Sequence, residues 1–151
     1  MKEFKSIEDI LDFAINNEQN AVNFYTELAE NAANPEMKEV FKQFAKEEMG
    51  HKARLLNVKS TGDYRMPEGK VVDLKIGDYL VDVKPYPGMS YQEALILAMK
   101  REKNAFKLYM DLSERAPTAE LKTLFLSLAQ EESKHKLRFE IEYDEFILQE
   151  N

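Results

Sequence analysis

Apolar side chains recur along this chain at steps of three, four and seven positions, the spacing that places them on one face of an α-helix. Four stretches show this periodicity, and they cover residues 7–32, 35–58, 91–116 and 119–146. Polar and charged residues fill the remaining positions of each stretch, as on a helix with one face in a core. The pattern therefore predicts four amphipathic helices and an all-α fold.

The second pair of helices repeats the first at an offset of 84 positions, the difference between 135 and 51. On the first helix of each pair the aligned residues are Leu11 and Leu95, Ala14 and Ala98, Glu18 and Glu102, Ala21 and Ala105, Tyr25 and Tyr109, Leu28 and Leu112, and Ala32 and Ala116. On the second helix they are Met37 and Leu121, Phe41 and Phe125, Phe44 and Leu128, Glu48 and Glu132, His51 and His135, and Leu55 and Phe139. We therefore predict a single domain, residues 1–151, with an internal duplication of about 6–58 and 90–148.

The predicted helix starts are duplicated as well. Ser6 and Ser90 each precede an acidic residue by three positions, the arrangement of a capping box. Asn34 and Thr118 stand before the second and fourth helices, where a side-chain oxygen caps the first turn. The connections at these two residues are short, so the two helices of each pair are expected to lie antiparallel and side by side.

Residues 59–89 separate the two pairs and hold four of the five glycines and three of the five prolines. A connection of this length reaches from one end of a bundle to the other, so we expect the third helix to run parallel to the second. Two segments within it, 71–76 and 79–81, are expected to pack locally as strand or as turn. The prediction is a four-helix bundle of two antiparallel hairpins joined by a long crossover.

Four glutamates interrupt the apolar stripes where the pattern would place Leu or Ala: Glu18, Glu48, Glu102 and Glu132. Glu18 lies about 16 residues before the first turn and Glu48 about 14 after it, so an antiparallel hairpin brings them nearly level. The second pair has the same spacing. The only two histidines, His51 and His135, each follow one of these glutamates by three positions and share its helix face. All six side chains should converge on one layer of the core.

Burying four carboxylates without partners would cost on the order of several kcal/mol each. Two divalent cations would cancel the four charges, and carboxylate oxygens with imidazole nitrogens suit iron or manganese. A single Glu-x-x-His is also a common surface pattern. Two copies, in register with two further seam glutamates, favour a dinuclear centre for which each repeat supplies one Glu and one Glu-x-x-His.

Composition narrows the possible partners. The formal net charge of −7 argues against nucleic acid and against an anionic membrane surface. No apolar run approaches the roughly 20 residues that cross a bilayer, and the charged N-terminal residues are unlike a signal peptide, so we expect a cytoplasmic protein. The absence of cysteine excludes disulfides and cysteine-held iron centres within this chain.

These motifs resemble those of the ferritin-like di-iron carboxylate superfamily, and in particular its rubrerythrin branch. The resemblance spans the four predicted helices and includes Glu18-Gln19-Asn20-Ala21 with Tyr25, and Glu102 with Tyr109. It implies two iron ions per chain, with manganese as the alternative. It also implies a role for each metal ligand: Glu48 and Glu132 would bridge the metals, Glu18 and His51 would be terminal ligands of one, and Glu102 and His135 of the other.

Four further residues have two interpretations each. Tyr25 and Tyr109 lie two turns from the terminal glutamates and are either core aromatics or hydroxyl donors to carboxylates of the opposite hairpin. Glu47 and Glu131 either orient the histidines through the free ring N–H or are simply solvated.

The chain departs from rubrerythrins in two respects. Ala105 stands where they carry an additional glutamate, which argues against exchange of His for Glu at one iron, and their cysteine-rich rubredoxin domain is missing. The remaining six-ligand set is equally similar to that of bacterioferritin, in which a Met after the second-helix Glu binds haem. Met49 occupies that position, but Ser133 does not repeat it, so Met49 is interpreted as a surface or interface residue.

The resemblance implies an enzyme that reduces hydrogen peroxide or dioxygen, is reset by an external electron-donor protein and forms a homodimer. Ferroxidase activity with iron storage is the first alternative. It is disfavoured because ferritins have a further short helix after the fourth, and the chain ends at Asn151. A di-manganese catalase is the second alternative, since the ligand set accepts either metal.

Overall fold

The computed structural model describes residues 2–4, 7–61, 72–74 and 85–150. Its four long helices are α1 (Ile7–Glu30), α2 (Pro35–Thr61), α3 (Tyr91–Arg115) and α4 (Ala119–Glu150). All four predicted helix ends shift: α1 and α3 end two residues and one residue earlier than expected, whereas α2 and α4 continue three and four residues further. The predicted all-α fold is confirmed. Among the described residues, no helix is long and apolar enough to span a lipid bilayer.

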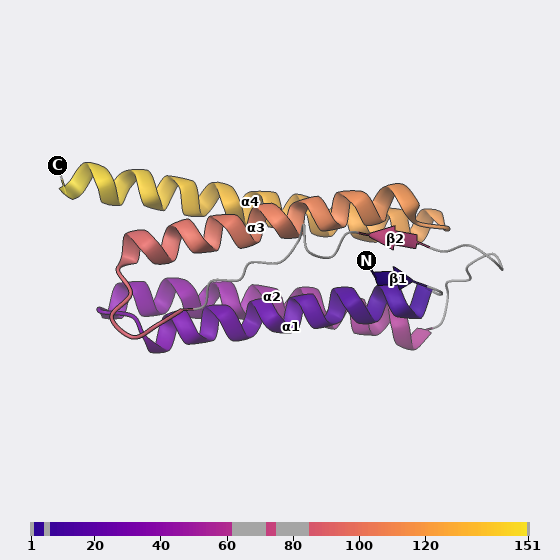
Figure 1. The fold of residues 1–151 in the computed structure, drawn as a ribbon, viewed down its shortest axis with the longest axis horizontal. Coiled ribbons are helices and arrows are strands. Elements are labelled where there is room, and N and C mark those ends of the chain that lie inside the picture. Colours follow the sequence, from indigo (N-terminus) through magenta and orange to yellow (C-terminus); the bar gives the residue numbers. More distant parts are fainter. Residues whose placement is uncertain (1, 5–6, 62–71, 75–84, 151) are drawn as a thin grey trace.

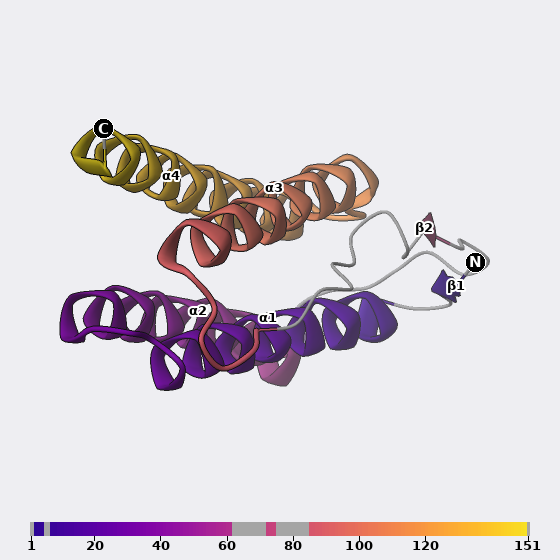
Figure 2. The ribbon, with the colours of Figure 1, turned by 60° about the vertical axis from the view of Figure 1, so that its left-hand side comes forward.

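The helices form two antiparallel hairpins. Figure 1 shows α1 beside α2 and α3 beside α4, and in Figure 2 the two hairpins form two layers. The third helix begins at the end of the bundle where α2 begins and runs parallel to α2, as predicted. Most of that crossover lies outside the described residues, including the segment 79–81.

Side-chain caps repeat at the same offset as the sequence. The Oδ1 atom of Asn34 accepts a hydrogen bond from the backbone N–H three residues later at 2.8 Å, and Thr118 Oγ1 does the same at 3.2 Å. The hydroxyl of Ser90 caps α3 in this way at 3.1 Å. The equivalent cap expected at Ser6 lies outside the described residues. The caps fix where each helix starts, and thereby the level at which its glutamate lies.

The core consists of two apolar clusters, one towards each end of the bundle. One cluster is centred on Leu11, Tyr109 and Phe125, and the other on Tyr25, Phe44 and Phe139. The predicted apolar positions are all buried except four alanines, which are half-buried: Ala21, Ala32, Ala105 and Ala116. The layer of glutamates and histidines lies between the clusters, so apolar side chains close it off along the bundle axis.

A small two-stranded sheet accompanies the bundle. Strand β1 (Lys2–Phe4) pairs antiparallel with β2 (Val72–Leu74), with Glu3 opposite Asp73. The expectation for 71–76 left strand and turn open, and the structure shows a strand at its centre. This sheet ties the start of the chain to the crossover at the end of the bundle where α1 begins (Figure 1).

Candidate metal centre

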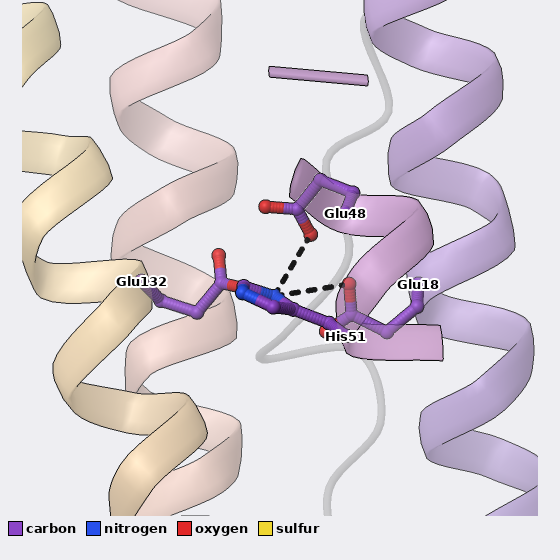
Figure 3. Close-up of side chains that lie close together, drawn as sticks. All are labelled: Glu18, Glu48, His51 and Glu132. Atoms are coloured by element: carbon purple, nitrogen blue, oxygen red, sulfur yellow. Dashed lines mark ion pairs between the residues drawn. The ribbon is translucent and has the colours of Figure 1, made fainter. Parts of the chain in front are cut away.

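The four seam glutamates meet in the middle of the bundle, one from each helix. Their side chains are no more than 3% exposed, although all four carry an ionisable group. His51 on α2 and His135 on α4 join them one turn further along and are also buried. Figure 3 shows Glu18, Glu48, His51 and Glu132 pointing towards one another across the two hairpins. The structure thus brings together all six side chains that the sequence predicted to converge.

The six residues form two overlapping groups whose potential ligand atoms all lie within 4.8 Å of one another. One group contains Glu18, Glu48, His51 and Glu132, and the other contains Glu48, Glu102, Glu132 and His135. Glu48 and Glu132 therefore belong to both groups. This is the arrangement expected if these two carboxylates bridge two metal ions and each remaining pair completes one site.

Each histidine turns its Nδ1 atom towards the carboxylates. His51 Nδ1 lies 2.7 Å from Glu132 and 3.6 Å from Glu18. His135 Nδ1 lies 3.0 Å from Glu48 and 3.7 Å from Glu102. The Nδ1 atoms are therefore the candidate ligands, and the Nε2 atoms point outwards.

Several buried polar atoms of this layer lack a hydrogen-bond partner among the described residues. They are Glu18 Oε2, His51 Nδ1, Glu102 Oε2 and Glu132 Oε1. The 2.7 Å contact of His51 with Glu132 is close but is not aligned as a hydrogen bond. Buried polar atoms are nearly always paired, so unpaired atoms that face one another fit a pair of cations. Four carboxylates and two imidazoles match the preferences of divalent iron or manganese.

Without bound cations, burial and close contacts between the ionisable groups of this layer shift several of their pKa values. Burial, reinforced by the neighbouring carboxylates, raises the pKa of Glu18 and of Glu132 well above the ordinary value. Burial acts in the same direction on Glu48, but hydrogen bonds with Glu18 and the histidines outweigh it and lower its pKa. For the histidines, burial lowers the pKa, yet contacts with the carboxylates prevail and raise it to about 10 for His51 and about 9 for His135. Metal ions would replace these protons as the positive charge.

Two tyrosines donate hydrogen bonds to the terminal glutamates across the hairpins. The Tyr25 hydroxyl on α1 donates to Glu102 on α3, and the Tyr109 hydroxyl on α3 donates to Glu18 on α1. Both rings are completely buried and stack on phenylalanines. Both features of the two interpretations are therefore present, because the rings belong to the core and the hydroxyls donate to carboxylates of the opposite hairpin.

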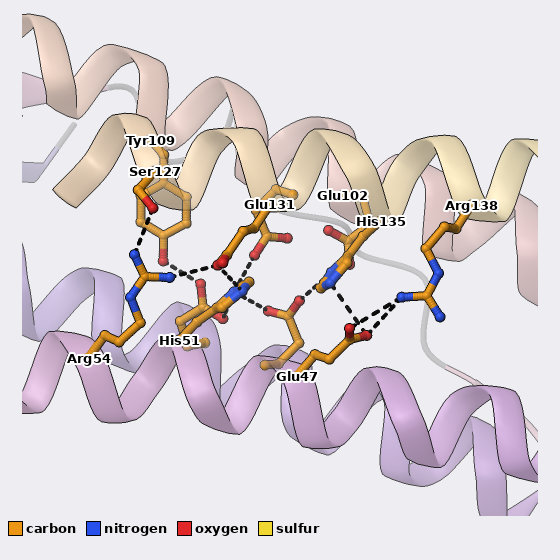
Figure 4. A network of polar contacts seen from close by, with 12 residues as sticks. Glu47, His51, Arg54, Glu102, Tyr109, Ser127, Glu131, His135 and Arg138 are labelled. Atoms are coloured by element: carbon orange, nitrogen blue, oxygen red, sulfur yellow. Dashed lines mark hydrogen bonds and ion pairs between the residues drawn. The ribbon is translucent and has the colours of Figure 1, made fainter. Parts of the chain in front are cut away.

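An outer layer of acids and arginines contacts the histidines (Figure 4). Glu131 Oε2 lies 2.8 Å from His51 Nε2, and Glu47 Oε2 lies 3.5 Å from His135 Nε2, each from the opposite hairpin. Arg54 binds Glu131 at 2.7 Å, and Arg138 binds Glu47 at 3.1 Å. Each acid is thus held by an arginine and lies near the outer nitrogen of a histidine, and its predicted role of orienting that ring stays a prediction.

The sequence analysis missed these arginines, although the duplication contains the signal. Arg54 and Arg138 are 84 positions apart, and each follows its histidine by three residues. The repeated motif is therefore Glu-Glu-x-x-His-x-x-Arg. Half-exposed arginines on a helix surface are ordinary in a single copy, and only the offset marks this pair.

Two spaces adjoin the centre. A cavity of about 20 Å³ borders the carboxylates on the side of α1 and α3, where Asn17, Ala21, Arg101 and Ala105 line it with Tyr25. A groove of about 400 Å³ lies between α2 and α4, over the outer edges of both histidines. All four seam glutamates line the small cavity, and Ala105 faces it with a methyl group where rubrerythrins have a glutamate.

Met49 points away from this layer. Its side chain is 57% exposed on α2, as expected for a surface or interface residue. Gly50, next along the helix, lines the groove over the histidines instead.

Comparison with known proteins identifies related sequences and folds. The family model described as Rubrerythrin matches residues 9–79 and 93–151, which include all six candidate ligands. A hypothetical protein from Pyrococcus furiosus has a similar structure, with 29% identity, a TM-score of 0.67, and coverage of 89% of this chain and 86% of that one.

A second similar structure is the crystal structure of a Thermotoga maritima protein described as ferritin-like and diiron-carboxylate. It is 20% identical, covers 96% of this chain and 99% of its own, and has a TM-score of 0.73, which supports the fold. Among curated proteins, none matches this chain.

Proposed function

The chain belongs to the rubrerythrin family, and from that premise we propose that it is a di-iron oxidoreductase that reduces hydrogen peroxide with electrons from an external donor protein. The observation that carries this proposal is the sharing of Glu48 and Glu132 between two ligand groups. Shared carboxylates hold two metal ions close enough to act on one small molecule together.

Each ligand has a defined role in this proposal. Glu18 and His51 would hold one ion, Glu102 and His135 the other, and Glu48 and Glu132 would bridge them. When bound, the metal pair supplies Lewis acidity and two electrons. Peroxide takes up these two electrons and two protons to give two molecules of water. The tyrosine hydroxyls keep the terminal carboxylates oriented, and burial and the nearby glutamates raise the pKa of both tyrosines, so they remain hydrogen-bond donors.

The small cavity limits the size of the substrate. One water molecule needs about 10–15 Å³ of such space, and the cavity beside the carboxylates has about 20 Å³. Hydrogen peroxide and dioxygen are small enough for a space of this size. Tyr25 and Arg101 line the cavity together with the four seam glutamates, and such a polar lining favours hydrogen peroxide because it both donates and accepts hydrogen bonds.

In this proposal the electrons come from another protein. The chain contains no cysteine, so it has no rubredoxin-type centre of its own to reduce the metal pair again after each turnover. The groove between α2 and α4 places the outer edges of both histidines next to its surface. We propose this face as the docking site of the donor, because both candidate histidine ligands line it.

Anaerobic reconstitution followed by stopped-flow kinetics tests the proposal. Purified protein should bind two Fe(II) per chain, and peroxide should oxidise the di-ferrous protein faster than dioxygen at equal concentration. Saturation at one ion, or no binding, contradicts the dinuclear centre. A dioxygen reaction that is equally fast or faster contradicts the peroxidase assignment.

Ferroxidase activity with iron storage is the second candidate, and Ala105 is the observation that favours it. Without a carboxylate at that position the ligand set is the six-residue set of a ferroxidase centre. Uptake of many irons per chain into a large assembly would support this candidate. Metal analysis of the protein as isolated distinguishes iron from manganese and so tests the di-manganese catalase.

A further inference from the structure

The two halves of the centre are related by the duplication, yet they hold their histidines differently. His51 Nε2 lies 2.8 Å from Glu131 Oε2, a close ion-pair contact, whereas His135 Nε2 lies 3.5 Å from Glu47 Oε2. An acid on the outer nitrogen fixes the ring and makes the inner nitrogen a stronger ligand. The structure therefore gives His51 the firmer support.

The arginines extend this difference. Arg54 binds Glu131 at 2.7 Å and Ser127 at 2.8 Å, so two contacts on α4 fix its guanidinium (Figure 4). Arg138 binds Glu47 at the longer distances of 3.1 and 3.2 Å, and its guanidinium lies over the ring of Phe44, 4.5 Å from the centroid. The cause lies in the sequence, because Ser127 is replaced by Gln43, and Phe44 by Leu128, at the equivalent positions of the other repeat.

Positive charge is also distributed unequally. Arg101 precedes Glu102, whereas Asn17 precedes Glu18 at the equivalent position. Arg101 lines the small cavity beside the carboxylates, with its guanidinium 4.6 Å from the centroid of the Phe24 ring. Lys134 precedes His135 where Gly50 precedes His51, and it lines the groove over the histidines. Both additional cations belong to the second repeat, and a fixed positive charge weakens the binding of a metal cation nearby.

We propose that the two metal positions are unequal: the position of Glu18 and His51 binds its ion first and more tightly, and that of Glu102 and His135 binds second and exchanges its ion more readily. This inference rests on the proposed dinuclear centre. Two independent features carry it, namely the firmer support of His51 and the additional cations beside Glu102 and His135.

Stepwise titration with Mn(II) tests the assignment, since this ligand set accepts manganese. Free Mn(II) is counted by electron paramagnetic resonance, which also separates single bound ions from coupled pairs. Glu131→Gln should weaken the first binding step about tenfold and leave the second nearly unchanged. Glu47→Gln should spare the first step and weaken only the second. Both changes preserve side-chain shape at half-exposed positions, so the fold should survive.

A second pair of variants tests the charge argument separately. Arg101→Asn installs the residue found at the equivalent position of the first repeat. It should strengthen binding of the second Mn(II) ion about five- to tenfold, which brings the two dissociation constants closer together. Lys100→Asn removes the same charge from an exposed neighbouring position and should change neither step by more than about twofold.

The outcomes separate the two proposals. Absence of Mn(II) binding would contradict the dinuclear centre itself. Two ions bound with equal effects of Glu131→Gln and Glu47→Gln, or with the first step weakened by Glu47→Gln alone, would leave the centre intact and overturn the inequality. An unchanged second step in Arg101→Asn would overturn the contribution of charge.

Discussion

Replacement of Tyr25 by phenylalanine should weaken both the fold and the metal centre. Its hydroxyl donates to Glu102 across the hairpins, and the residue is completely buried. Tyr25→Phe removes one oxygen and keeps the ring, whose centroid lies 5.8 Å from that of Phe139 and 5.7 Å from that of Phe44. No cavity of consequence forms, so the effect reports the lost hydrogen bond.

The structure sets the size of the effect. A hydrogen bond to a charged group is worth about 1.5–3 kcal/mol. For a chain of this length that amounts to a melting temperature roughly 3 to 12 °C lower. Because the hydroxyl also orients a metal ligand, affinity at the position of Glu102 and His135 should fall about 10- to 100-fold.

Anaerobic urea unfolding and metal competition with a chromophoric chelator measure the two effects. Tyr91→Phe is the matched control, because its hydroxyl donates to Glu142 at 2.7 Å in a half-buried position away from the centre. The control should lose some stability and no metal affinity. If Tyr25→Phe binds metal as tightly as Tyr91→Phe does, the hydroxyl has no part in holding the ligand and our reasoning fails.

Two further predictions concern the whole protein. Metal-free protein should lose stability as the pH rises from about 7 to 10, because the folded state raises the pKa of His51 to about 10 and of His135 to about 9. This stabilisation is complete below the unfolded pKa of about 6.5 and disappears as the pH passes the folded values; urea midpoints that increase over this range would contradict it. We also predict a homodimer, so light scattering after gel filtration should give the mass of two chains, whereas a mass of about two dozen chains would favour storage.

The features that interrupt the regular apolar pattern of the helices could be predicted from the sequence alone. Glu18 and Glu102 stood out because a charge in an apolar stripe is costly to bury, and the duplication showed that neither was accidental. Tyr25 and Tyr109 could be predicted as hydrogen-bond donors, because each lies two helical turns from a seam glutamate on the same helix face. Helix order, hairpins and the direction of the crossover followed from turn lengths alone.

The features that could not be predicted depend on contacts between surface residues that are far apart in the sequence. Arg54 meets Glu131 on another helix, and no local pattern marks such a contact. Strand β1 (Lys2–Phe4) is only three residues long and depends on a partner in the crossover. The proposed inequality of the two metal positions could not be predicted from the motifs either. It arises from differences between the repeats, such as Asn17 at the position equivalent to Arg101, that leave the ligand motifs identical.

The crosswise hydrogen bonds also determine when the centre can form during folding. Tyr25 and Glu102 are separated by 77 positions, and Tyr109 and Glu18 by 91, so each hydrogen bond joins one hairpin to the other. A helical hairpin needs only local contacts and forms early, whereas contacts this distant along the chain have to wait until the intervening loop closes. An isolated hairpin therefore has half a ligand set and no tyrosine donor for its own glutamate. Metal ions arriving during synthesis would find the complete centre only after α4 has docked, so the last of these four helices to be synthesised is the one that completes it.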